Sequence, residues 1–250
     1  MAPPPIALRP FGRAQDLELE FADGDRPGLV TALLAGCGET SDAEFWWAQT
    51  VGTRIAALLR VLALSEGDDA LSVRLRCPAP ACGEAFEVAL PFAALASTAP
   101  PDEADAAQPV PVALAGGRSA GLRRPTGHDL RDWHRTPYAS RQQAVAAMLA
   151  ALVVEGAVTA EDEPTVADAM ATHDPLVAFT VTCACPACGA ESDHPVDLEA
   201  IALARLAAQQ RALTCEVHVL ASTYGWSERD ILAVAPARRA RYLALIEDGR

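Results

Sequence analysis

Two cysteine motifs limit what this chain can fold into more than any other feature of its sequence. CPAPACG stands at residues 77–83 and CACPACG at residues 183–189. Each motif follows an apolar segment and precedes a short strand-like segment, so each predicts a strand, a tight knuckle and a return strand. The glycine after the second cysteine, Gly83 or Gly189, supplies a turn position without a Cβ atom. The sequence therefore predicts two copies of one strand–knuckle–strand unit.

The knuckle cysteines have the chemistry and spacing of a structural zinc site. Zinc takes four ligands in a tetrahedron, favours sulfur, and is usually held by close ligand pairs on tight turns. Alignment of the two motifs at their Cys-Gly pairs gives the predicted ligands Cys77, Cys82, Cys183 and Cys188. Cys185 is an alternative to Cys183, because two residues between ligands is the commoner spacing, and His194 is a further candidate for the fourth ligand. The competing interpretation is reduced cysteines on turns that bind no metal.

A metal at this place would be structural. Cys77 and Cys183 lie 106 residues apart, so the ion would join distant parts of the chain and contribute to folding. A catalytic zinc needs an open coordination position, and the sequence contains neither His-Glu-x-x-His nor His-x-Glu ahead of a Pro-Cys-x-x-Cys motif. Phosphate-binding and hydrolase motifs rich in glycine are also missing. We therefore expect no catalytic residues, no small-molecule substrate and no cofactor other than structural zinc. A zinc-dependent hydrolase remains an alternative.

Charge and hydropathy argue against a nucleic-acid-binding, membrane or secreted protein. The formal net charge is −13, and all 20 basic residues are arginine, so nucleic acid is not expected as a partner. A zinc-ribbon adaptor for transcription or nucleic-acid handling would need an exposed basic patch near the knuckles, and it remains an alternative.

No apolar run reaches the roughly 18–20 residues of a bilayer span, and the proline-rich start does not resemble a secretory signal. We expect a cytoplasmic protein without a membrane partner, whose cysteines are thiols or metal ligands.

The sequence predicts an α+β fold that is mainly helical, with a helical region at the C-terminus. Alternation over Asp16–Phe21 predicts a strand, the segment Ala43–Leu64 predicts one long helix, and Gly116-Gly117 predicts the turn of a hairpin. The predicted parts are an extended or disordered lead (1–15), a first half (16–97), a linker (98–109), a second half (110–197) and a helical C-terminal region (198–250).

Two segments outside the knuckles have a functional and a structural interpretation. In RRPTGHD, residues 123–129, Thr126 can cap a helix, and the segment is either a capped turn or a partner contact. Near the C-terminus a break at Tyr224–Ser227 separates helices, and Arg238, Arg239 and Arg241 form a basic cluster that is either solvated surface or a contact for an acidic partner. Aromatic side chains are expected mostly in the core, and any that are exposed are interface candidates; they are Phe45, Trp46, Trp47, Tyr224 and Trp226.

The order of these motifs resembles one known family. EVHVLASTYGWSERDIL followed by RRARYL, the RRPTGHDL turn, the paired knuckles and HDPLVAFTVTCACPACG resemble baseplate and hub-assembly proteins of contractile phages of the T-even type and of related extracellular contractile injection systems. The resemblance covers about residues 70–247. It implies a non-enzymatic protein that binds other baseplate or tail proteins, either as a transient assembly factor in the cytoplasm or within a phage-like particle.

Overall fold

The computed structural model describes residues 6–22, 24–98 and 108–248. The fold is α+β and mainly helical, with small antiparallel sheets, as the sequence predicts. Most of the predicted linker and the first five residues of the predicted lead lie outside the described residues. No helix in the described part of the chain is long and apolar enough to span a bilayer.

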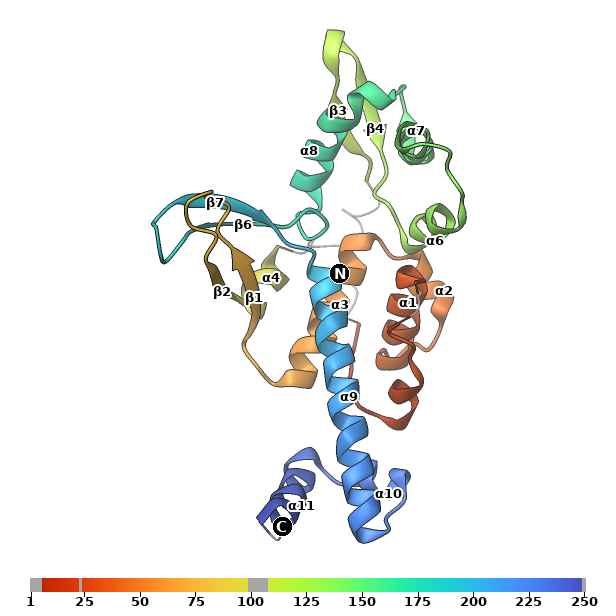
Figure 1. Cartoon of the computed structure of the whole chain (residues 1–250). Coiled ribbons are helices and arrows are strands. Elements are labelled where there is room, and N and C mark those ends of the chain that lie inside the picture. The colour runs from red at the N-terminus through yellow and green to blue at the C-terminus, as the bar shows by residue number, and fades with distance from the viewer. Residues whose placement is uncertain (1–5, 23, 99–107, 249–250) are drawn as a thin grey trace.

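Buried apolar side chains form three clusters, which define three units of the molecule (Figure 1). The largest cluster lies in what we call the central body. Its elements are η1 (Ala14–Glu18), α1 (Arg26–Cys37), α2 (Ala43–Ala48), α3 (Val51–Glu66), β1 (Ala70–Arg76), β2 (Ala85–Pro91), α4 (Phe92–Ser97), β6 (Thr180–Ala184), β7 (Glu191–Pro195) and the first part of α9 (Leu198–Tyr224).

The second unit is the part at the top of Figure 1, around the three-stranded sheet β3-β4-β5. Its elements are β3 (Val110–Ala113), η2 (Ala115–Gly117), β4 (Ser119–Leu122), α6 (Gly127–Arg135), α7 (Arg141–Leu152), β5 (Val153–Glu155), η3 (Ala160–Asp162) and α8 (Glu163–His173). The predicted hairpin is present, and Gly116 and Gly117 both have the positive φ that its turn requires. Leu176, Val181 and Val196, further along the predicted second half, pack instead into the central body.

The C-terminal unit is small and lies at the opposite end of the molecule (Figure 1). It comprises the end of α9, α10 (Glu228–Ala233) and α11 (Pro236–Asp248). Gly225, in the left-handed conformation, ends α9, and Ser227 caps α10 by accepting from the amide of Asp230. The predicted break between these helices is therefore confirmed.

The strand predicted over Asp16–Phe21 is wrong, because the segment begins inside the 3₁₀ helix η1 and its remaining residues form no strand. Asp16 is buried, and its carboxylate accepts from the amides of Gly12 and Arg13 at 2.8 Å and from the Arg9 guanidinium at 2.7 Å. These bonds satisfy the carboxylate only in a tight turn. Asp16 therefore points into the protein, whereas the alternating pattern predicts that this polar residue faces solvent.

The long helix predicted over Ala43–Leu64 is two helices, α2 and α3, separated at Thr50. The Thr50 hydroxyl caps α3 by accepting from the amide of Thr53. Thr50 also forms a β-bridge with Thr126 of the second unit, and the amide of Val51 donates to the carbonyl of Pro125 at 2.9 Å. The break is thus the place where the second unit joins the central body.

A buried arginine next to this junction holds three helices of the central body together. Arg54 of α3 is fully buried and donates to Thr31 Oγ1, the Trp46 carbonyl and the Pro27 carbonyl at 2.8–2.9 Å. Its guanidinium lies 5.2 Å from the ring centroid of Trp47. Burial lowers the pKa of Arg54 to about 10. The side chain therefore ties α1, α2 and α3 together at the cost of its own hydration.

We predict that Gly52→Ala destabilises the protein although alanine favours helices. A Cβ atom at Gly52 would lie 1.9 Å from Oδ1 of Asp174, whose carboxylate is buried over the first turn of α3. Burial raises the pKa of Asp174, and the attraction of Arg124 opposes this shift. The clash is expected to cost about 1–3 kcal/mol, seen as a lower melting temperature. Gly24→Ala is the control, because its Cβ would meet no atom within 4 Å. Equal melting temperatures for the two variants would contradict the prediction.

Candidate metal centre

Two antiparallel hairpins, β1–β2 and β6–β7, lie side by side at one edge of the central body (Figure 1). In β1 the inward side chains Leu71, Val73 and Leu75 are buried, and the alternating residues are exposed. This period-two pattern fixes the register of the first hairpin, with Val73 opposite Val88. In the second hairpin Val181 lies opposite His194. The two cysteine motifs are the turns of these hairpins.

The two turns have the same backbone pattern. The amide of Cys77 donates to the carbonyl of Glu84 at 2.8 Å, and the amide of Cys185 donates to the carbonyl of Ala190 at 2.9 Å. In each turn the residue before that carbonyl, Gly83 or Gly189, has a positive φ, of 64° and 74° respectively. The glycine requirement expected from the sequence is therefore real, since other residues are strained in this conformation.

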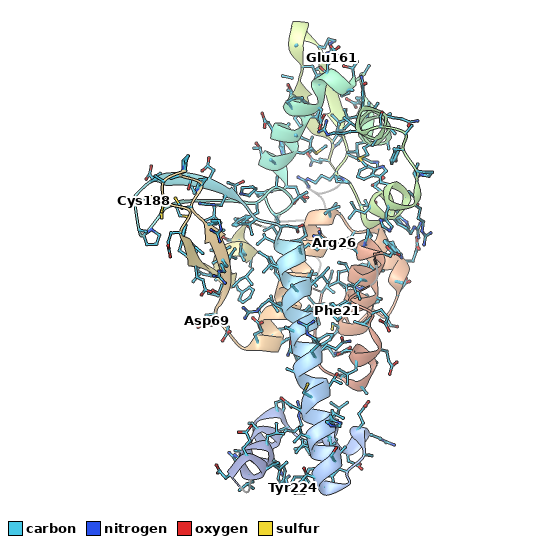
Figure 2. The ribbon with its side chains drawn as sticks, viewed as in Figure 1. Phe21, Arg26, Asp69, Glu161, Cys188 and Tyr224 are labelled. Carbon is cyan, nitrogen blue, oxygen red and sulfur yellow. The ribbon has the colours of Figure 1, made fainter. Side chains whose placement is uncertain are left out.

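The turns bring four sulfur atoms together. Cys77, Cys82, Cys185 and Cys188, which we call the cysteine cluster, have Sγ atoms that all lie within 4.8 Å of one another. Between hairpins, Cys77 and Cys188 are 3.7 Å apart and Cys82 and Cys185 are 3.9 Å apart. Cys77 and Cys185 are buried, and Cys188 is exposed where Figure 2 labels it at the edge of the molecule. The cluster can hold a metal ion, and no disulfide links its members.

The predicted preference for Cys183 is corrected, because the alternative, Cys185, occupies the cluster. Cys183 lies within β6, paired with Ser192, and packs against the apolar cluster of the central body. Alignment at the Cys-Gly end overlooked that the first turn is two residues longer than the second. The sequence does contain a signal, since proline directly follows Cys77 and Cys185 but not Cys183.

His194, the other candidate ligand, lies outside the cysteine cluster. Its Nε2 is 2.9 Å from the Ser192 hydroxyl, and its ring packs edge-on against Phe86 at 5.9 Å. His194 therefore contributes to the contact between the two hairpins. Phe86 belongs to β2 and His194 to β7.

The electrostatics of the cluster fit a cation. The backbone amides of Cys188 and Ala187 donate to Cys185 and lower its pKa to about 7. An amide at Ala79 also favours the Cys77 thiolate, but burial and the neighbouring sulfurs outweigh it and raise the pKa of Cys77 to about 12. Thiolates at this spacing repel one another, and a bound divalent ion removes that repulsion. Four sulfur donors are the ligand set of closed, structural metal sites.

The two remaining cysteines stand apart from the cluster. Cys37 is buried at the end of α1, where burial raises its pKa to about 11. Cys215 is exposed on α9. Both are therefore suitable controls for substitutions in the cluster, and Cys215 is the better one because its replacement leaves the core intact.

The RRPTGHD segment forms the capped turn that begins α6. The carboxylate of Asp129 accepts from the amide and hydroxyl of Thr126 and from both terminal nitrogens of Arg123, the latter at 2.6 Å. Burial would raise the pKa of Asp129, but these bonds outweigh it and hold the pKa below its usual value. The structural interpretation of this segment accounts for Arg123, Thr126 and Asp129.

Comparisons with known proteins give no match. No family model, no curated protein and no solved structure matches the chain.

Proposed function

We propose that this chain is a non-enzymatic structural or assembly protein of the baseplate of a phage-like contractile tail or injection system, stabilised by one structural zinc. The observation that carries the proposal is the cysteine cluster, which draws its four sulfurs from two hairpins more than 100 residues apart in sequence. Such an ion links two distant parts of the chain. The remaining support for a baseplate role is the sequence resemblance described above.

Zinc is the proposed metal because of the donor set. Thiolate ligands select zinc, copper(I) or iron–sulfur clusters, and a single tetrahedral site of four cysteines is typical of structural zinc. Four sulfurs leave no open position for water, which argues against the zinc-dependent hydrolase. When bound, the ion would supply charge neutralisation and a link between the hairpins, while Cys77 and Cys82 hold it from one side and Cys185 and Cys188 from the other.

We also propose that the two hairpins are copies of one unit. Both turns begin with Cys-Pro and end with Cys-Gly, and the amide of the first cysteine donates to the residue after the glycine. The first turn carries two additional residues. This relation supports the interpretation of the chain as a duplicated knuckle unit with other elements inserted between the copies.

The net charge of −13 and the mixed charges around the knuckles favour protein partners over nucleic acid. Exposed Arg74 and Arg76 on β1 stand beside exposed Glu84 and Glu87, so the hairpin surface is not uniformly basic. The proposed partners are therefore other baseplate or tail proteins, bound without a membrane or a small-molecule substrate. The proposed location of this protein is the cytoplasm or the phage-like particle assembled there.

Deletion of the gene in the organism that encodes it tests the proposal. We expect loss of assembled contractile particles, with unattached tube or sheath proteins, and restoration by the wild-type gene. Cys185→Ser should fail to restore assembly, whereas Cys215→Ser should restore it, because only Cys185 belongs to the cluster. Normal particles in the deletion strain, seen by electron microscopy, would rule the function out.

A further inference from the structure

The C-terminal unit has a small core and a partly exposed group of aromatic rings. Its core contains few buried side chains, namely Val217, Leu220 and Ile231. Next to them, the rings of Tyr224, Trp226 and Tyr242 form a triad with centroids 5.0–5.7 Å apart. Tyr224 is 39% exposed and is labelled at the lower end of the molecule in Figure 2. Aromatic residues at an exposed end are typical anchors of protein interfaces.

The three arginines of α11 divide into one structural and two surface residues. Arg239 is buried, bonds to Glu216 of α9 at 3.0 Å and donates to the carbonyl of Val234, so it holds α11 in place. Arg238 and Arg241 are exposed. Among the described residues, no carboxylate lies within ion-pair distance of either, although the chain carries 13 more acidic than basic side chains.

Arg238 is held in an ordered position. Its guanidinium lies 5.7 Å from the ring centroid of Tyr242 and donates to the Tyr242 hydroxyl at 3.1 Å. A side chain ordered before binding loses less conformational entropy when a partner binds. Arg238 therefore presents a preorganised positive charge beside the aromatic triad.

The outward side of α11 is apolar between these charges. Residues three and four apart lie on one side of a helix, and here that side is exposed along its whole length. We call it the α11 face; its residues are Ala237, Arg238, Ala240, Arg241, Ala244 and Leu245. Leu245 is 63% exposed, and Asp248 ends the face, so the positive charge lies in the first part of the helix.

We infer that the α11 face docks an acidic segment of a partner protein, one that also inserts an apolar side chain beside Leu245. Charge complementarity identifies the partner as acidic, because Arg238 and Arg241 present two exposed positive charges beside the aromatic triad and neither has a carboxylate partner among the described residues. The inference rests on the proposed function in one respect, namely that the partner is expected among tail proteins.

The variants are Arg238→Glu/Arg241→Glu, which reverses the charge, and Leu245→Ser, which removes the apolar contact without touching the core. The matched control is Arg135→Glu/Arg211→Glu, since both residues are exposed, neither makes an ion pair among the described residues, and the change in net charge is identical. All chains are full length, and far-UV circular dichroism with zinc content confirms that each one folds.

Tagged chains are first recovered from lysates of the organism that encodes them, with and without nuclease treatment, and the captured proteins are identified by mass spectrometry. Each identified partner is then purified, and its affinity is measured at low and high salt. We expect an acidic protein that binds the wild type and the control, binds Arg238→Glu/Arg241→Glu about tenfold or more weakly, binds Leu245→Ser more weakly, and loses affinity as salt rises.

Equal capture of every partner by all variants would overturn the docking surface, and so would capture that disappears after nuclease treatment. Self-association in sedimentation that the Arg238→Glu/Arg241→Glu variant alone abolishes would identify a second copy as the occupant and would overturn docking of a partner protein.

The two proposals can fail separately. Tail proteins captured equally by all variants support the function and overturn the docking surface. A purified acidic partner from outside the tail, bound through the α11 face, supports the docking surface and overturns the function.

Discussion

Replacement of Cys185 by serine is expected to abolish zinc binding by the purified protein. Cys185 supplies one of four sulfurs in the cysteine cluster, and loss of one ligand leaves an open, weak site. Substitution of a group behind a ligand typically costs 10–100-fold in metal affinity, so loss of the ligand itself should cost more than about 100-fold. The measurement is the zinc-to-protein ratio by plasma emission spectrometry after dialysis, with an expected fall from about one to nearly none.

Cys183→Ser is the discriminating control, because Cys183 lies only two residues away but packs in the central body. This variant should retain zinc, as should Cys215→Ser. Chelator treatment of the wild type should lower its melting temperature, because binding energy at a site formed by two separate hairpins contributes to folding. A variant pair with the opposite behaviour, zinc lost in Cys183→Ser and kept in Cys185→Ser, would refute the assignment of ligands.

Trp46→Ala should cause the largest loss of stability outside the cysteine cluster. Trp46 of α2 is completely buried in the central body and packs edge-on against Phe45 at 5.2 Å. Truncation of a buried tryptophan costs about 3–5 kcal/mol, which corresponds to about 10 °C in melting temperature for a chain of this size. Thermal unfolding followed by circular dichroism measures the effect.

Two further variants make the Trp46 prediction specific. The indole N–H of Trp46 is buried without a hydrogen-bond partner among the described residues, so Trp46→Phe removes an unsatisfied donor and keeps an aromatic ring. Its cost should be about 1–2 kcal/mol. Leu64→Ala, on the exposed side of α3, should change stability by less than about 0.5 kcal/mol. Similar losses in Trp46→Ala and Leu64→Ala would show that Trp46 is not in the core.

Local chemistry explains which parts of the fold could be predicted from the sequence. The hairpin at Gly116-Gly117, the helix break at Tyr224–Ser227 and the glycines of the two knuckles depend on residues adjacent in sequence, and the structure contains all of them. The cysteine cluster was foreseen except for one ligand. That error came from counting back from the Cys-Gly pair, whereas the position of the first ligand is set by the hydrogen bond from its own amide across the hairpin.

The errors elsewhere arise from contacts between distant residues. Thr50 lies between two helices, caps the second and pairs with Thr126, and nothing near Thr50 in sequence indicates that partner. Asp16 is buried because Arg9 and two backbone amides satisfy its carboxylate. In both cases hydrogen-bond partners determine the position of a polar group, and hydrophobic periodicity does not reveal those partners.

The helix α9 runs without a proline or glycine from the central body to the C-terminal unit. Its 27 residues correspond to about 40 Å of continuous helix. An uninterrupted helix resists bending, because sharp kinks arise almost always at proline, glycine or a disrupted hydrogen-bond ladder. The C-terminal unit is therefore held at a fixed distance and angle from the central body, and a partner bound at the aromatic triad would keep a constant position relative to the two hairpins.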